Sequence, residues 1–269
     1  MKYTITILAI LVIFQAAAQK SAQRDLEIGA IGGISWYNGD LNSQKIFGRD
    51  YINKAYGVSI RKNLNRRFAL RSTAVYSTLG ASDQVAKYSA QALRNLSFKT
   101  KIYELGGLLE FNFLEYDAMI NHKRFTPYSF VGLSVFRFNP TTEVEGSFYE
   151  LQPLQTENKK YSLVSIAIPF GFGFKYALTD RFIINTDWGM RRTFTDYLDD
   201  VSSDYPYPED LDGLSENLSD RSLEQTGPDG TNWGTQRGNA KTKDWYSFVT
   251  LGLSIRIGPK KGSCKHIGI

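Results

Sequence analysis

The eleven residues from Tyr103 to Phe113 constrain the fold of this chain more than any other segment. Read with a period of two, they divide into an apolar face that begins and ends in aromatic residues and a face that carries two carboxylates. The apolar face is Tyr103, Leu105, Leu109, Phe111 and Phe113, and the other face is Glu104, Gly106, Leu108, Glu110 and Asn112. A strand that crosses a bilayer needs about 9–11 residues, with its apolar face toward lipid and aromatic residues at both interfaces. The segment therefore predicts a membrane-spanning β-strand beside a polar barrel interior.

Seven further segments alternate in a similar way and bring the expected number of strands to eight. They span residues 26–37, 55–61, 67–79, 125–138, 162–176, 181–192 and 244–257. The connections between them alternate between long loops and shorter turns, and the longest loop covers residues 193–243. Outer-membrane barrels have an even strand number, short periplasmic turns and long external loops. The fold prediction is all-β: an eight-stranded antiparallel transmembrane β-barrel with long extracellular loops. A secreted β-sandwich is the alternative, but it gives no reason for the alternation of connections.

The first residues predict export. Lys2 precedes an apolar stretch from Ile5 to Phe14, and Ala16-Ala17-Ala18 forms a small-residue cleavage site. This is the pattern of a secretory signal peptide. We expect a signal peptide over residues 1–18, an outer-membrane barrel over 19–257 and a periplasmic C-terminal tail over 258–269.

The strand faces turned away from lipid carry five basic and four acidic residues. They are Glu27, Arg61, Arg71, Glu104, Glu110, Lys175, Asp187, Arg191 and Arg256. A buried charge without a partner is costly. An eight-stranded barrel is wide enough only for its own side chains to fill. The sequence therefore predicts a salt-bridged plug rather than an open pore.

Several function classes are disfavoured. The net charge is +5, but the 32 basic residues are scattered among 27 acidic ones, so we expect no nucleic-acid partner. A hydrolase at the outer rim needs a general base, commonly histidine. The only histidines, His122 and His266, fall in a periplasmic turn and in the tail of the predicted topology. No phosphate-binding loop or zinc-ligand spacing is present. We expect a non-enzymatic protein without cofactor or metal.

The longest loop contains an acidic group, Asp196, Asp199, Asp200 and Asp204. Carboxylates grouped with backbone carbonyls are typical Ca²⁺ ligands. The spacing does not match an EF-hand, and a solvated acidic loop on the external side is the favoured interpretation.

The tail contains the only cysteine, Cys264, among the basic residues Lys260, Lys261 and Lys265. An unpaired cysteine in an exported protein suggests an intermolecular disulfide or a reactive thiol, and the periplasm is oxidising. One hypothesis is a disulfide with a periplasmic lipoprotein that the lysines guide into place. The other is an incidental cysteine on a frayed tail.

Short strings along the chain resemble the PorG-like family of outer-membrane barrels. They are Arg94–Phe98, Glu104–Phe113, Phe125–Tyr128, Phe138–Pro140, Leu151–Glu157, Ile168–Gly171, Asp196–Ser202 and the region Gln236–Asp244. The resemblance implies a non-enzymatic component of type IX protein secretion that anchors a periplasmic ring containing a lipoprotein to the outer membrane. Such a system supports gliding in some bacteria. The periplasmic turns and the tail would be the docking surface. A stand-alone OmpX-like barrel for adhesion or membrane stabilisation, acting through its external loops, is the alternative.

Overall fold

The computed structural model describes residues 26–42, 51–85, 89–118, 122–226 and 232–257. The predicted signal peptide and the 258–269 tail lie outside these residues. Eight antiparallel strands form a closed barrel in the neighbour order β3-β2-β1-β10-β9-β8-β5-β4, and the pairing of β3 with β4 closes it. Their bounds are β1 Leu26–Asn38, β2 Asn53–Asn63, β3 Phe68–Ser82, β4 Ser97–Asn112, β5 Phe125–Arg137, β8 Val164–Ala177, β9 Phe182–Thr193 and β10 Trp245–Ile257. The predicted eight-stranded barrel is confirmed.

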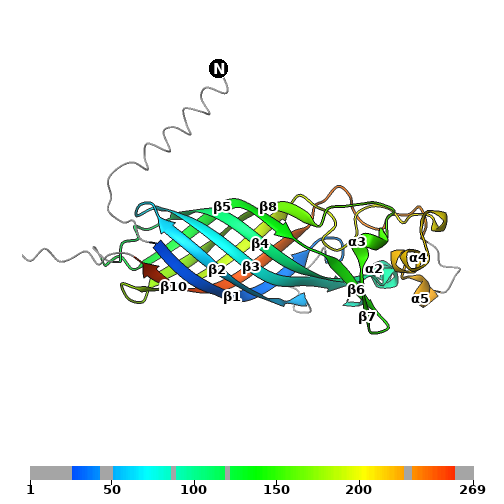
Figure 1. Cartoon of the computed structure of the whole chain (residues 1–269), viewed down its shortest axis with the longest axis horizontal. Coiled ribbons are helices and arrows are strands. Elements are labelled where there is room, and N and C mark those ends of the chain that lie inside the picture. Colours follow the sequence, from blue (N-terminus) through cyan, green and yellow to red (C-terminus); the bar gives the residue numbers. More distant parts are fainter. Residues whose placement is uncertain (1–25, 43–50, 86–88, 119–121, 227–231, 258–269) are drawn as a thin grey trace, which may run out of the picture.

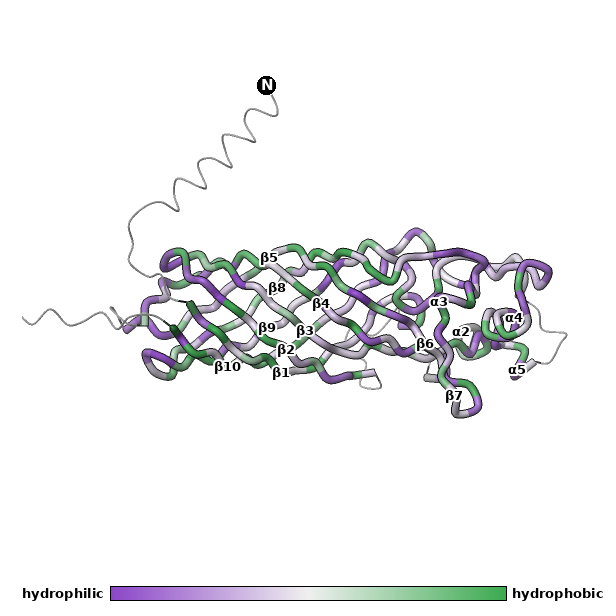
Figure 2. Tube along the Cα trace, viewed as in Figure 1, coloured by the Kyte–Doolittle hydropathy of each residue, from purple (hydrophilic) through white to green (hydrophobic). Residues whose placement is uncertain are grey.

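The barrel is apolar outside and polar inside. Along β4, buried and exposed residues alternate almost without interruption, and the exposed positions from Tyr103 onward include Leu105, Leu109 and Phe111. Figure 2 shows hydrophobic colour along the barrel wall and hydrophilic colour concentrated at both ends. This is the arrangement of a barrel that crosses a membrane, in which closure satisfies every strand edge.

The two ends of the barrel differ (Figure 1). One end carries the connections β2–β3, β4–β5 and β8–β9 with the start of β1 and the end of β10; we call it the short-turn end. The other end carries the long connections, which fold into a cap. The first and last strands pair along their whole length, from Leu26 opposite Ile257 to Asn38 opposite Trp245.

The cap contains secondary structure that the sequence pattern did not predict. Its elements are η2 Asp83–Val85, α2 Ser89–Arg94, β6 Pro140–Val144, β7 Ser147–Glu150, α3 Leu151–Leu154, η3 Pro208–Asp210, α4 Leu214–Ser219 and α5 Leu223–Thr226. β6 pairs with β4 and forms a hairpin with β7. Both residues of the hairpin turn, Glu145 and Gly146, have positive φ, as a two-residue turn between strands favours. In the described part of the chain, no helix is long and apolar enough to cross a membrane.

An apolar core lies at the cap end of the lumen. It combines inward residues of the strands, such as Leu79, Ile102 and Phe136, with Leu198 and Val201 from the longest loop. All five side chains are buried. This core attaches the longest loop to the mouth of the barrel, and it separates the charged lumen from the polar interior of the cap.

Candidate functional site

Glu110 is the centre of the charged lumen. Its carboxylate lies 3.0 Å from Arg61 Nε, 2.9 Å from Arg71 Nε and 3.0 Å from Lys175 Nζ. All four side chains are almost completely buried. Strands β2, β3 and β8 each supply one cation to a carboxylate on β4. Three cations around one buried carboxylate leave an excess of positive charge, which neighbouring residues must offset.

Two more carboxylates extend this group. Glu27 lies 2.9 Å from Arg61 Nη1 and 3.3 Å from Arg256 Nη2. Asp187 lies 2.6 Å from Arg71 Nη1 and also accepts a hydrogen bond from Tyr128. Seven of the nine predicted lumen charges therefore form one connected network of four cations and three anions.

The other two predicted lumen charges form a separate pair nearer the cap. Arg191 Nε lies 3.4 Å from Glu104, which also accepts a 2.5 Å hydrogen bond from the Tyr246 hydroxyl. The Arg191 guanidinium stacks over the ring of Phe248 at 4.3 Å. A void of about 20 Å³, lined in part by Arg71, Asp187 and Arg191, is present inside the barrel among the described residues. That volume holds about one water molecule, so the side chains around this void leave little free space between them.

A second polar centre lies in the cap, where Tyr37 meets two aspartates. The Tyr37 hydroxyl lies 2.5 Å from Asp199 Oδ2 and 2.7 Å from Asp244 Oδ1, and all three residues are buried. A hydroxyl has one hydrogen to donate. The second contact is a hydrogen bond only if the carboxyl itself carries a proton. Burial, reinforced by Asp40, raises the pKa of Asp199 well above its usual value, and burial and Asp199 do the same to the pKa of Asp244.

Asp200 and Glu157 form the adjoining part of this centre. Arg237 Nη1 lies 3.0 Å from Glu157 and Nη2 lies 3.9 Å from Asp200. Asp200 also accepts hydrogen bonds from Tyr161, at 2.5 Å, and from Thr156. Burial raises the pKa of Asp200 to about 6, although Arg237 and the two hydroxyl donors act in the opposite direction.

The prediction of a solvated acidic loop is wrong for three of its four residues. Asp196, Asp199 and Asp200 are only 3%, 1% and 1% exposed, whereas Asp204 is exposed to solvent. The physical reason is that Leu198 and Val201 enter the apolar core, so the aspartates between them are buried with the loop. In the described residues, no group of three or more His, Cys, Asp and Glu side chains is arranged to hold a metal ion. In the sequence, the mixture of aspartates with the apolar residues Leu198 and Val201 is the signal that indicates burial of this loop.

The short-turn end carries a rim of exposed and partly exposed charges. Glu115 lies 3.7 Å from Arg66 and 2.5 Å from Lys123, and Arg124 lies 3.4 Å from Asp180. His122 is also exposed at this rim. The predicted partner-binding residues Cys264, Lys260, Lys261 and Lys265, together with His266, lie outside the described residues, so this tail stays a prediction.

Comparison with known proteins identifies a family. The family described as "Domain of unknown function (DUF6089)" matches residues 2–221. The chain belongs to the DUF6089 family. No curated protein matches it.

Solved barrels resemble this DUF6089 chain at low identity. The attachment invasion locus protein Ail of Yersinia pestis, in complex with the heparin analogue sucrose octasulfate, is 10% identical, with a TM-score of 0.42; the match covers 88% of this chain and 100% of Ail. Neisserial surface protein A is 12% identical, with a TM-score of 0.43 and coverage of 86% and 97%. The outer membrane protein OprG from Pseudomonas aeruginosa is 12% identical, with a TM-score of 0.43 and coverage of 90% and 99%.

Proposed function

We propose that this protein is a non-enzymatic outer-membrane barrel that anchors a periplasmic ring in type IX protein secretion. The observation that carries the proposal is the filled lumen, in which Glu110 and its partners occupy the interior. A barrel filled in this way acts through its two ends rather than through a pore. The resemblance to the PorG-like family supports the choice of secretion among the roles open to such a barrel.

The short-turn end is the docking surface in this proposal. The predicted signal peptide and short turns agree with a periplasmic location for this end. Lys123 is exposed and Arg66 and Arg124 are partly exposed there beside acidic partners, and ion pairs of this kind are weak enough to exchange for pairs with another protein. The basic tail follows from the same end, and Cys264 forms the proposed disulfide with a ring-forming periplasmic lipoprotein.

The first experiment compares native membranes from wild type and Cys264→Ser on a non-reducing gel, with mass spectrometry of any shifted band. We expect a thiol-sensitive adduct that contains a periplasmic lipoprotein in wild type alone. A heat-modifiable monomer in both samples would remove the covalent anchor.

A truncation after Ile257 tests the docking role separately. We expect it to leave a folded, heat-modifiable barrel but to abolish surface export of secretion substrates. Unchanged export by the truncated protein would contradict the anchoring role, whether or not a disulfide forms.

Adhesion through the cap is the alternative function. It is favoured by large apolar side chains that the cap exposes, namely Phe148, Phe194 and Tyr207, which are 63%, 55% and 53% accessible. Exposed apolar groups in an ordered region are typical of contact surfaces. Replacing Phe148 and Tyr207 by serine should abolish cell attachment under this alternative, and should leave substrate export unchanged under the secretion role.

A further inference from the structure

The lipid-facing surface of the barrel has an asymmetric charge distribution. The outward positions of the eight barrel strands contain six charged residues, and all six are basic. They are Lys54, Lys62, Lys99, Lys101, Arg137 and Arg192. All except Lys62 lie toward the cap end of their strands. The basic residues of the short-turn end lie mainly in its turns beside acidic partners, whereas those at the cap end lie on the strand wall itself.

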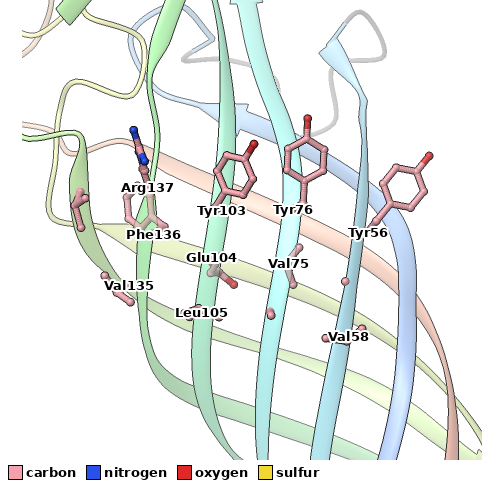
Figure 3. Close-up of a pocket in the computed structure, with 13 residues that line it drawn as sticks. Tyr56, Val58, Val75, Tyr76, Tyr103, Glu104, Leu105, Val135, Phe136 and Arg137 are labelled. Atoms are coloured by element: carbon pink, nitrogen blue, oxygen red, sulfur yellow. The ribbon is translucent and has the colours of Figure 1, made fainter.

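A row of tyrosines lies beside these cations. Tyr56, Tyr76 and Tyr103 are successive cross-strand partners on β2, β3 and β4, and Arg137 on β5 pairs with Tyr103. Figure 3 shows the three phenol hydroxyls and the Arg137 guanidinium pointing in the same direction. Lys101 precedes Tyr103 by two residues on the same exposed face. The row therefore forms a polar edge of hydroxyl and cationic donors.

An apolar groove of about 720 Å³ opens next to this edge on the outer surface of the barrel. Its outward floor contains Val58, Ala74 and Leu105, which are cross-strand neighbours in the next row along the barrel. Ala74 is the smallest of the three, so the surface is hollowed at its position between the larger Val58 and Leu105. The groove is lined almost entirely by apolar side chains and is open to the lipid phase, a shape that suits an acyl chain.

The spacing of the cations indicates the kind of headgroup. Lys54, Lys101 and Arg137 lie on β2, β4 and β5, which span three strand spacings, or roughly 14 Å. One phosphate is too small to contact cations across that width. Arginine binds a phosphate through two parallel hydrogen bonds, and lysine acts as a point charge. The arrangement fits a headgroup with more than one anionic group. The tyrosine hydroxyls can form hydrogen bonds with sugar oxygens that lie between those anionic groups.

We propose that this surface binds a phosphorylated glycolipid of the cap-side leaflet, with one acyl chain in the groove and its phosphates on Arg137, Lys101 and Lys54. The inference rests on the proposed outer-membrane location, in which the cap faces outward. The lipid holds the barrel at a fixed depth and covers the side of the wall formed by β2 to β5.

The test uses the full-length mature protein in detergent, with diphosphoryl lipid A as the probe and native mass spectrometry as the readout. Wild type retains lipid A in preference to phosphatidylglycerol. In the doubly substituted protein Lys101→Gln, Arg137→Gln, we expect binding to fall about twenty-five-fold, since each cation near an anionic lipid surface contributes roughly a fivefold gain. Ala74→Leu, which fills the groove and keeps every cation, should also reduce retention.

Two matched controls separate this site from general charge and surface effects. Lys62→Gln removes a cation from the opposite end, and Ser72→Leu adds a leucine outside the groove, two residues along β3 from Ala74. Both should bind lipid A as wild type does. Equal loss in Lys62→Gln, no retention by wild type, or equal retention of phosphatidylglycerol would each overturn the proposal.

Heat-modifiable migration reports folding of every variant, so a misfolded protein is recognised before binding is measured. The secretion readout is independent of the lipid readout. Protein truncated after Ile257 should still retain lipid A, because the groove lies in the cap half of the barrel and β10 ends at Ile257 at the short-turn end. If the wild-type protein supports export but does not retain lipid A, this inference is wrong and the secretion role stands. If the protein retains lipid A but does not support export, the secretion role is wrong and this inference stands.

Discussion

The lumen and the cap both bury many ionisable groups, but they stabilise them in different ways. In the lumen, each predicted charge has an oppositely charged neighbour, and Glu110 alone contacts three cations. In the cap, Asp199 and Asp244 are buried against a tyrosine hydroxyl and against each other's charge. Ion pairing stabilises the lumen charges, whereas the Asp199–Asp244 pair depends on a retained proton, although the adjoining Glu157 is paired with Arg237. The two regions should therefore respond differently to substitution and to pH.

The largest expected effect is the removal of the central lumen carboxylate. Glu110→Gln leaves Arg61, Arg71 and Lys175 without their common counter-charge, so the free energy of unfolding should fall by about 3–5 kcal/mol. Denaturant titration in detergent or lipid vesicles, followed by heat-modifiable migration, measures this loss. Glu115→Gln at the exposed rim is the control and should change little. Equal stability of Glu110→Gln and wild type would show that the lumen does not depend on paired charges.

The cap should lose stability as the pH rises. Asp200 has a pKa of about 6 in the folded cap, above the unfolded value near 3.8. Between pH 3.8 and pH 6, the folded state therefore binds a proton that the unfolded state has lost. The stabilisation is complete below about pH 4 and is lost as the pH rises through 6, with a total of about 3 kcal/mol at most. Hydrogen exchange of residues 196–203 at pH 5 and pH 8 measures it.

Asp200→Asn is the matched variant for that experiment. An asparagine amide resembles the protonated carboxyl, and asparagine tolerates the positive φ of 65° at this position. We expect exchange in this variant to vary much less between pH 5 and pH 8. If its pH dependence equals that of wild type, other groups control opening of the cap.

The smallest expected effect comes from Tyr37→Phe, which removes the hydroxyl between Asp199 and Asp244 but keeps the ring. Loss of the shared hydrogen bonds should destabilise the cap by about 1–3 kcal/mol. Proteolysis of the cap measures the change, and the short-turn end should keep its wild-type resistance. Destabilisation of the whole barrel instead would show that cap and lumen unfold as one unit.

The barrel wall could be predicted from the sequence because lipid imposes a strict alternation on each spanning strand. The prediction began β4 at Tyr103, whereas the strand begins at Ser97. In the added segment the apolar residues Phe98 and Ile102 face inward, and Lys99 and Lys101 face outward. This part of the strand extends beyond the hydrocarbon layer toward the cap, so its outward face is polar and its inward face is apolar. A search for strands with an apolar outward face therefore misses it.

The inward positions could also be predicted, because each charge between two lipid-facing residues must face the lumen. Which carboxylate meets which cation depends on strand register, and alternation does not determine register. The cap could not be predicted, since its longest segment has no regular period. Leu198 and Val201 are buried in one cluster with Ile102, Phe136 and other residues of distant strands, and only the closed barrel brings those residues together.

The full-length pairing of β1 with β10 has a consequence for assembly. Because the first and last strands form the seam, no N-terminal fragment can close, and both edges stay unpaired until the last residues of the chain are available. The pairing residues are more than two hundred positions apart in the sequence, so their encounter is slow. Until they meet, the unpaired edges of the sheet are prone to aggregation. Closure of the wall is therefore a late step in folding, because it depends on the C-terminal strand.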